Sequence, residues 1–172
     1  MPNKKVRRSK LGRFAYQVKV SLAGVKPPIW RRLLARDNTD LHKFHLIIQD
    51  AMGWQNCHLY QFEIEETRYT EFSDADFIAE DEIPASSARL GDLALREGDW
   101  FVYNYDFGDD WYHECEVEKI TPFEPGAEYP RHVGRGSRGE RFGRPDRPAA
   151  AIPHRDLILL GSIRLHAEES PP

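Results

Sequence analysis

The stretch Asn104–Glu118, NYDFGDDWYHECEVE, joins two runs of alternating side chains through one glycine. A two-residue turn with glycine in first place is one that β-hairpins favour, so the chain is expected to reverse at Gly108-Asp109. The reversal pairs Phe107 with Asp110, and the rest of the register follows by counting along both strands. The predicted pairs are Asp106 with Trp111, Asn104 with His113, Val102 with Cys115, and Trp100 with Val117.

This register gives the hairpin two different faces, because successive side chains of a strand point to opposite sides. The side with Trp100, Val102 and Val117 is the more apolar one, so it is the expected core face, with His113 pointing inward. The other side is mixed and can be solvated or can hold a protein partner. It carries Phe101, Tyr103, Tyr105 and Tyr112 opposite Glu114, Glu116 and Glu118.

Periodicity predicts the elements around the hairpin. Alternating residues indicate strands over 14–22, 29–35 and 58–65, whereas the apolar arc that starts at Leu41 indicates a helix. Thr39 or Asp40 can cap the start of this helix, and Gly53 is expected to end it. Residues 66–89 are acidic and without a clear period, which indicates a surface excursion. The expected fold class is α+β, with a small antiparallel sheet, one main helix packed on it and basic flexible termini.

Charge divides the chain into three parts, which are also the expected domain organisation. Residues 1–13 carry six basic groups and no acidic one, residues 14–130 carry 10 basic and 23 acidic groups, and residues 131–147 carry six arginines and two acidic groups. We expect a basic flexible arm over 1–13, an α+β domain over 14–130, and a disordered tail rich in arginine, glycine and proline over 131–172. Nucleic-acid contact is predicted for the arm through Lys4, Lys5, Arg7, Arg8, Lys10 and Arg13.

Composition and missing motifs exclude several classes of protein. Two cysteines, Cys57 and Cys115, are too few for a disulfide framework or a four-thiolate zinc site. The sequence contains no run of about 20 apolar residues and no secretory signal, so we expect a cytoplasmic protein without a membrane segment. Phosphate-binding glycine loops and serine-hydrolase elbows are also missing from the sequence.

Several polar residues are expected to converge where the helix and the next strand pack on the hairpin. His45 and Gln49 lie one helical turn apart, and His58 opens the following strand on its inward face. The candidate pocket consists of His45, Gln49, His58, Asn104, Asp106 and His113.

The pocket admits two interpretations. Imidazole and carboxylate groups can bind a divalent metal such as zinc, iron, nickel or manganese, and the candidate ligands are His45, His58, His113 and Asp106. Alternatively, these groups satisfy one another by hydrogen bonds beneath the sheet and fix the orientation of the helix. No H-x-x-x-H or H-E-x-x-H pair is present to favour the metal.

Four motifs, VKPPIWRRL, FHLIIQDAMGW, HLYQF and YDFGDDWYHECEVE, together resemble the plasmid pRiA4b ORF-3-like family. The resemblance spans about Tyr16 to Pro130 and implies an α+β domain with an antiparallel sheet. It also implies association with plasmids and with insertion sequences, where some members are labelled TnpR-like. The positions that match the family motifs are Pro28, Trp30, His45, Gln49, Gly53, Trp54, His58, Asp106, Gly108, Asp109, Trp111 and His113.

The sequence departs from the family pattern at two places. Tyr60 stands where many relatives have a second histidine, and the tail after Pro130 replaces the usual cysteine-containing continuation. A frameshift or a lineage-specific tail is our hypothesis for the second departure.

Two functions follow as hypotheses. One is a non-enzymatic binding or accessory module of mobile DNA, with a protein partner on the aromatic and acidic face and nucleic acid at the basic ends. The alternative is a metal-dependent, hydrolase-like enzyme that uses the histidine and aspartate pocket.

Overall fold

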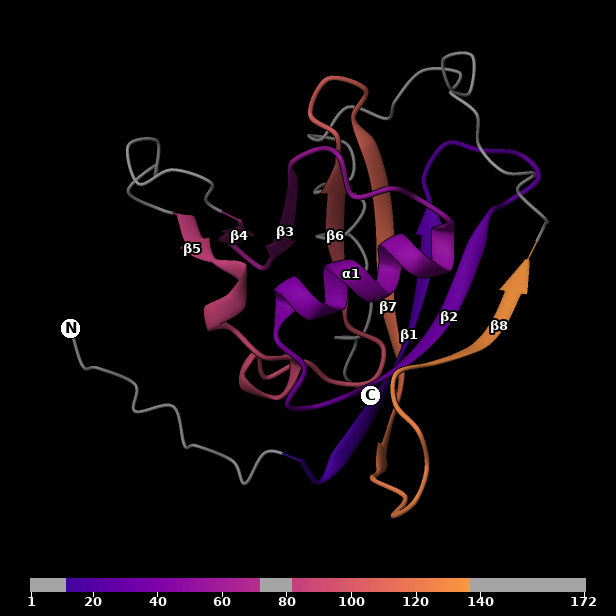
Figure 1. Ribbon diagram of the computed structural model, residues 1–172, viewed down its shortest axis with the longest axis vertical. Coiled ribbons are helices and arrows are strands. Elements are labelled where there is room, and N and C mark those ends of the chain that lie inside the picture. Colours follow the sequence, from indigo (N-terminus) through magenta and orange to yellow (C-terminus); the bar gives the residue numbers. More distant parts are fainter. Residues whose placement is uncertain (1–11, 72–81, 137–172) are drawn as a thin grey trace, which may run out of the picture.

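In the part of the chain that the structure describes, one α-helix lies across one face of an eight-stranded sheet (Figure 1). The computed structural model describes residues 12–71 and 82–136. Its helix is α1 (Leu41–Met52), and two 3-10 helices span Ala85–Ser87 and Leu90–Asp92. The strands are β1 (Phe14–Leu22), β2 (Trp30–Arg36), β3 (Tyr60–Ile64), β4 (Thr67–Thr70), β5 (Glu82–Pro84), β6 (Trp100–Tyr105), β7 (Trp111–Pro122) and β8 (Arg131–Gly136).

The expectation of a small antiparallel sheet is wrong. The strand order is β5-β4-β3-β6-β7-β1-β2-β8, and the β4–β5 pair is parallel, so the sheet is large and mixed. Three of its strands come from segments without a strand pattern. β4 and β5 lie in the acidic stretch that suggested a surface excursion, and β8 lies in the expected tail.

Helix α1 forms where its apolar arc and its end signals agree. The Asp40 carboxylate accepts the backbone N–H of Lys43 at 2.8 Å, which satisfies a donor that the first turn of a helix leaves free. Gly53 ends the helix in the left-handed conformation, with φ of 78°. The face that packs on the sheet consists of Leu41, Phe44, His45, Ile48, Gln49 and Met52.

The turn of the β6–β7 hairpin is longer than predicted, and the register changes with it. Tyr105 pairs with Trp111, and the five residues between them form the turn. Asp106 and Asp110 adopt left-handed conformations with φ of 61° and 53°, and the Asp106 carboxylate accepts the N–H of Gly108 at 3.1 Å. Aspartate tolerates this conformation because its side chain can bond the local backbone, so the chain does not need a glycine-first turn.

The one-residue shift reverses the side chains of β6 relative to the prediction. Tyr103 lies opposite His113 and Phe101 lies opposite Cys115, and all four side chains are buried on the helix side of the sheet. Val102 and Asn104 lie on the other side. His113 still points inward, because the parity of β7 is unaffected.

Residues 131–136, which the sequence assigned to the tail, form β8 against β2. This strand is ordered although it is poor in apolar residues. Its glycines leave space for neighbouring side chains of β2: a Cβ atom at Gly136 would overlap the Trp30 indole, and one at Gly134 would press on Arg32 and Trp30. The arm over 1–11 and the tail over 137–172 lie outside the described residues.

Candidate functional site

The most polar part of the core is a closed ring of hydrogen bonds between α1, β6 and the loop after the helix. The Gln49 amide donates to the Tyr103 hydroxyl at 2.9 Å, and the hydroxyl lies 2.7 Å from Nδ1 of His45. Nε2 of His45 lies 2.6 Å from the side-chain oxygen of Asn56, whose backbone N–H donates to Gln49 at 3.0 Å. All donors and acceptors match if His45 carries its proton on Nε2.

This ring holds His45 in its neutral form. The side chain is fully buried, and burial lowers the pKa of His45 to about 4. Burial also raises the pKa of the Tyr103 hydroxyl, so both groups are uncharged at neutral pH. The imidazole stacks on Tyr60 with ring centres 3.7 Å apart. With both ring nitrogens engaged, His45 has no free lone pair to bind a metal or to take a proton from a substrate.

His113 lies on the other side of Tyr103 and is also neutral. Its Nδ1 lies 3.3 Å from the backbone carbonyl oxygen of Tyr103, and the Trp54 ring packs edge-on against the imidazole at 5.4 Å. Burial lowers the pKa of His113 to about 4. Its Nε2 atom has no hydrogen-bond partner among the described residues. An acceptor lone pair left open in this way is tolerated more easily than an unpaired N–H donor.

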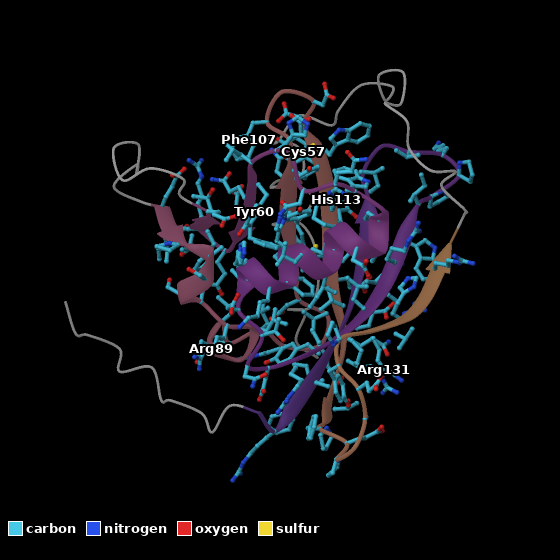
Figure 2. All side chains as sticks on the ribbon, viewed as in Figure 1. Cys57, Tyr60, Arg89, Phe107, His113 and Arg131 are labelled. Atoms are coloured by element: carbon cyan, nitrogen blue, oxygen red, sulfur yellow. The ribbon has the colours of Figure 1, made fainter. Side chains whose placement is uncertain are left out.

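His58 and Asp106 form a separate pair at the protein surface. Nε2 of His58 lies 3.3 Å from the Asp106 carboxylate, and half of the His58 side chain is exposed. The backbone N–H of Asp106 donates to the Leu59 carbonyl at 2.9 Å, which joins the loop after α1 to the β6–β7 turn. We call residues 53–59 and 106–110 together the loop end. Figure 2 shows Cys57 and Phe107 at the same end of the protein, whereas His113 is buried.

The six residues predicted for one pocket therefore occupy three places. His45 and Gln49 belong to the buried ring with His113 behind it, His58 and Asp106 are at the surface, and the Asn104 amide bonds Asp110 at 3.3 Å on the opposite face of the sheet. The predicted register would have put Asn104 beside His113, but Tyr103 takes that place.

The geometry of these residues offers the metal-dependent alternative no support. Across residues 12–71 and 82–136, no three histidine, cysteine, aspartate or glutamate side chains are placed to share a metal ion. The proposed ligands His45, His58, His113 and Asp106 are divided between the core and the surface, as described above.

Sequence reasoning missed four members of the site. Tyr103 was assigned to the wrong face, and Asn56 and Trp54 lie in a loop without periodicity. His42 was also missed: its Nδ1 lies 3.0 Å from the Tyr60 hydroxyl and 3.3 Å from the Glu71 carboxylate. His42 lies three residues before His45 on the helix, with ring centres 6.1 Å apart, and this spacing was the available signal that His42 belongs to the site.

The aromatic and acidic face predicted for a protein partner is different from the observed one. Phe101, Tyr103 and Tyr105 face the core, so their aromatic surface is not accessible there. The opposite face of the sheet carries Glu114 and Glu116, which are exposed, and Glu118, which bonds Arg32 and Gln17. The Arg32 guanidinium holds the pKa of the Glu118 carboxyl below its usual value.

The basic arm is mostly beyond the described part of the chain. Lys4, Lys5, Arg7, Arg8 and Lys10 lie outside it, and Arg13 is exposed just before β1. The Asp37 carboxylate holds this point by accepting the backbone N–H groups of Gly12, Arg13 and Phe14. No helix within the described residues has the length and apolar character needed to cross a membrane.

Two proteins similar to this chain are described as uncharacterized or of unknown function. It is 32% identical over 113 residues to the uncharacterized protein y4hQ of Sinorhizobium fredii (strain NBRC 101917 / NGR234), which covers 62% of this chain and 54% of that protein. The chain thus spans about half the length of this curated relative. It also resembles a crystal structure of a protein of unknown function, MM3350 from Methanosarcina mazei Go1, with 30% identity and a TM-score of 0.65, covering 72% of this chain and 70% of the other.

The family profile described as plasmid pRiA4b ORF-3-like protein matches residues 14–141. The match continues past Pro130 and includes all of β8, so the sequence stays similar to the family beyond the point where a frameshift was suspected. The match covers the whole sheet and the helix that carry the buried ring. The chain belongs to the plasmid pRiA4b ORF-3-like protein family.

Proposed function

We propose that the protein is a non-enzymatic binding module, an accessory of plasmids and mobile elements that binds a partner protein through its loop end. The observation that carries this proposal is the closed ring of His45, Tyr103, Gln49 and Asn56. Both nitrogens of His45 are used within the ring, so its role is to fix the loop after α1. A rigid loop loses less conformational entropy on binding than a mobile one.

The loop end also has the surface chemistry of a protein contact. Leu59 and Phe107 are large apolar side chains with 53% and 46% of their surfaces exposed. They are joined through the hydrogen bond from Asp106 to Leu59, and the turn adds the carboxylates of Asp106, Asp109 and Asp110. Aromatic side chains within a polar rim are typical of protein interfaces. The partner expected from this chemistry presents an apolar residue flanked by lysine or arginine.

Replacing both Leu59 and Phe107 by serine is expected to reduce partner binding by about tenfold or more, since truncating anchor residues commonly costs more than 1 kcal/mol each. The matched control is Ile83→Ser, because Ile83 is 39% exposed on β5, away from the loop end. The measurement is retention of host proteins on the immobilised full chain, with the unfolding midpoint of each variant measured in parallel.

Two results of this experiment would contradict the proposal. In the first, the double variant binds the same proteins as strongly as the unaltered chain. In the second, Ile83→Ser weakens binding as much as the double variant does. A fall in binding counts as support only where the unfolding midpoint of the double variant is unchanged.

We infer a second, electrostatic contact with nucleic acid through the basic arm. The support is the segregation of six basic groups into residues 1–13 of an otherwise acidic chain. Changing Lys4, Lys5, Arg7, Arg8 and Lys10 to glutamine is expected to abolish retention of double-stranded DNA at low salt. Lys26→Gln and Lys119→Gln serve as controls within the domain. Unchanged retention after the five substitutions would refute the nucleic-acid contact.

A further inference from the structure

A hollow separates the last turns of α1 from the edge strand β8. Its volume is about 230 Å³, below the 300–1,000 Å³ of clefts that hold drug-sized ligands, so it suits the side chains of a peptide. One wall is helical, the floor is Leu33 of β2, and the far wall is the start of β8. The lining residues are Leu33, Leu46, Ile47, Asp50, Ala51, Pro130, Arg131 and His132.

β8, which forms one wall of the hollow, is the last strand in the order of the sheet. Figure 1 shows this strand beyond β2, at the side of the sheet where α1 ends. An edge strand presents backbone N–H and C=O groups along its outer side, and an extended peptide can pair with them. The opposite edge is less suitable, because β5 has only three residues and one of them is Pro84, which has no N–H.

Buried Arg31 fixes the geometry between the two walls. Its Nε donates to the Ala51 carbonyl at the end of α1 at 2.8 Å, and its Nη1 donates to the carbonyls of Trp30 at 2.9 Å and Gly136 at 3.4 Å. One guanidinium thus ties the helix to β2 and β8. The groove between them is preformed, which lowers the entropic cost of binding.

The charge of the groove selects the partner. Arg131 and His132 line the hollow, and the exposed Arg135 lies further along the same strand. All three acceptors of Arg31 are carbonyl oxygens, so no carboxylate neutralises it among the described residues. Asp50 on the helix is the acidic residue of the lining, and Glu124 lies 3.9 Å from Arg131. Basic side chains on an edge strand repel a second copy of the same edge and attract an acidic segment.

We propose that the groove between α1 and β8 binds an extended acidic segment of a partner protein, which pairs with β8 and places apolar side chains against Leu46 and Ile47. Leu46 is 40% exposed, so it gains buried area when the segment binds. This site is separate from the loop end, and the two surfaces allow the module to join two proteins. Pairing with β8 supplies affinity, and the arginines supply selectivity.

A display library of random peptides of about twelve residues, selected on the immobilised full chain, tests this site directly. The expected result is enrichment of peptides that alternate acidic and apolar residues. Their binding should fall at least about tenfold in an Arg131→Glu/Arg135→Glu variant. The matched control is Arg68→Glu/Arg89→Glu, which makes the same change of charge at exposed positions away from the groove. Hydrogen exchange of the β8 amides should slow in the presence of the peptide.

Three outcomes would contradict the proposed peptide site in the groove: no enrichment of any peptide, enrichment of basic peptides, or equal binding of the selected peptides to the two charge-reversed variants. Failure of the groove is distinguishable from failure of the loop end. Peptides specific for the groove bind the Leu59→Ser/Phe107→Ser variant unchanged, whereas peptides that lose binding only in that variant support the loop end and contradict the groove.

Discussion

Between pH 6.5 and pH 4 the free energy of unfolding is expected to fall by about 6 kcal/mol, about 3 kcal/mol for each of His45 and His113. Both imidazoles are buried, with pKa values near 4 in the folded protein against 6.5 for an unperturbed histidine. The unfolded chain therefore binds more protons over this range. The stabilising contribution is complete above pH 6.5, falls as the pH drops below 6.5, and is largely lost at the folded-state pKa near 4.

Urea unfolding at a series of pH values measures this dependence. Because small proteins are stabilised by only about 5–15 kcal/mol, a loss of this size brings the protein close to unfolding at pH 4. A His113→Leu variant should show about half of the pH dependence, since one of the two buried imidazoles is removed. An unfolding free energy that stays constant between pH 6.5 and pH 5 would contradict the burial of two neutral histidines.

Tyr103→Phe is expected to cost about 3 kcal/mol of stability, because a buried polar group left without a partner costs about 1–3 kcal/mol. Removal of the hydroxyl leaves two such groups, Nδ1 of His45 and the Gln49 amide. The aromatic side chain at position 103 keeps its shape, so the variant removes the hydrogen bonds without changing the packing. Loss of the hydrogen-bonded ring should also loosen the loop that contains Asn56.

Tyr105→Phe is the matched comparison for this variant. The Tyr105 hydroxyl accepts the backbone N–H of Cys57 at 3.0 Å at the more accessible loop end, where water can replace it, so about 1 kcal/mol is expected. Denaturant unfolding of both variants gives the two values, and hydrogen exchange reports the loop after α1. If the Tyr103 variant were no less stable than the Tyr105 variant, the ring would not contribute as described.

The helix was predictable from local sequence signals. The features that the sequence did not reveal depend on contacts between residues far apart in the chain. Three features depend only on neighbouring residues and were readable from the sequence: the Asp40 cap, the end of the helix at Gly53, and the adjacency of His45 and Gln49. The length of the hairpin turn was not readable from the sequence, because the DFGDD segment is compatible with a two-residue turn as well as with the observed five-residue one. The difference of one residue moved Tyr103 into the core, so the centre of the ring was missed.

The strand β8 illustrates a second limit. Few apolar residues in a glycine-rich segment argued for disorder, but Gly134 and Gly136 are the positions that admit Trp30 and Arg32 of β2. That fit depends on a strand about 100 residues earlier in the chain, so composition alone could not show it. The groove beside β8 was unpredictable for the same reason.

We propose that the buried imidazoles of His45 and His113 remain neutral and serve to fix the loop end as a binding surface. Nitrogen NMR shifts of the imidazoles during a pH titration test it most directly. We predict that His45 and His113 stay neutral down to about pH 5 and that His45 carries its proton on Nε2, as its contacts with Tyr103 and Asn56 require. Protonation of either ring at pH 6 or above, or a proton on Nδ1 of His45, would contradict the account.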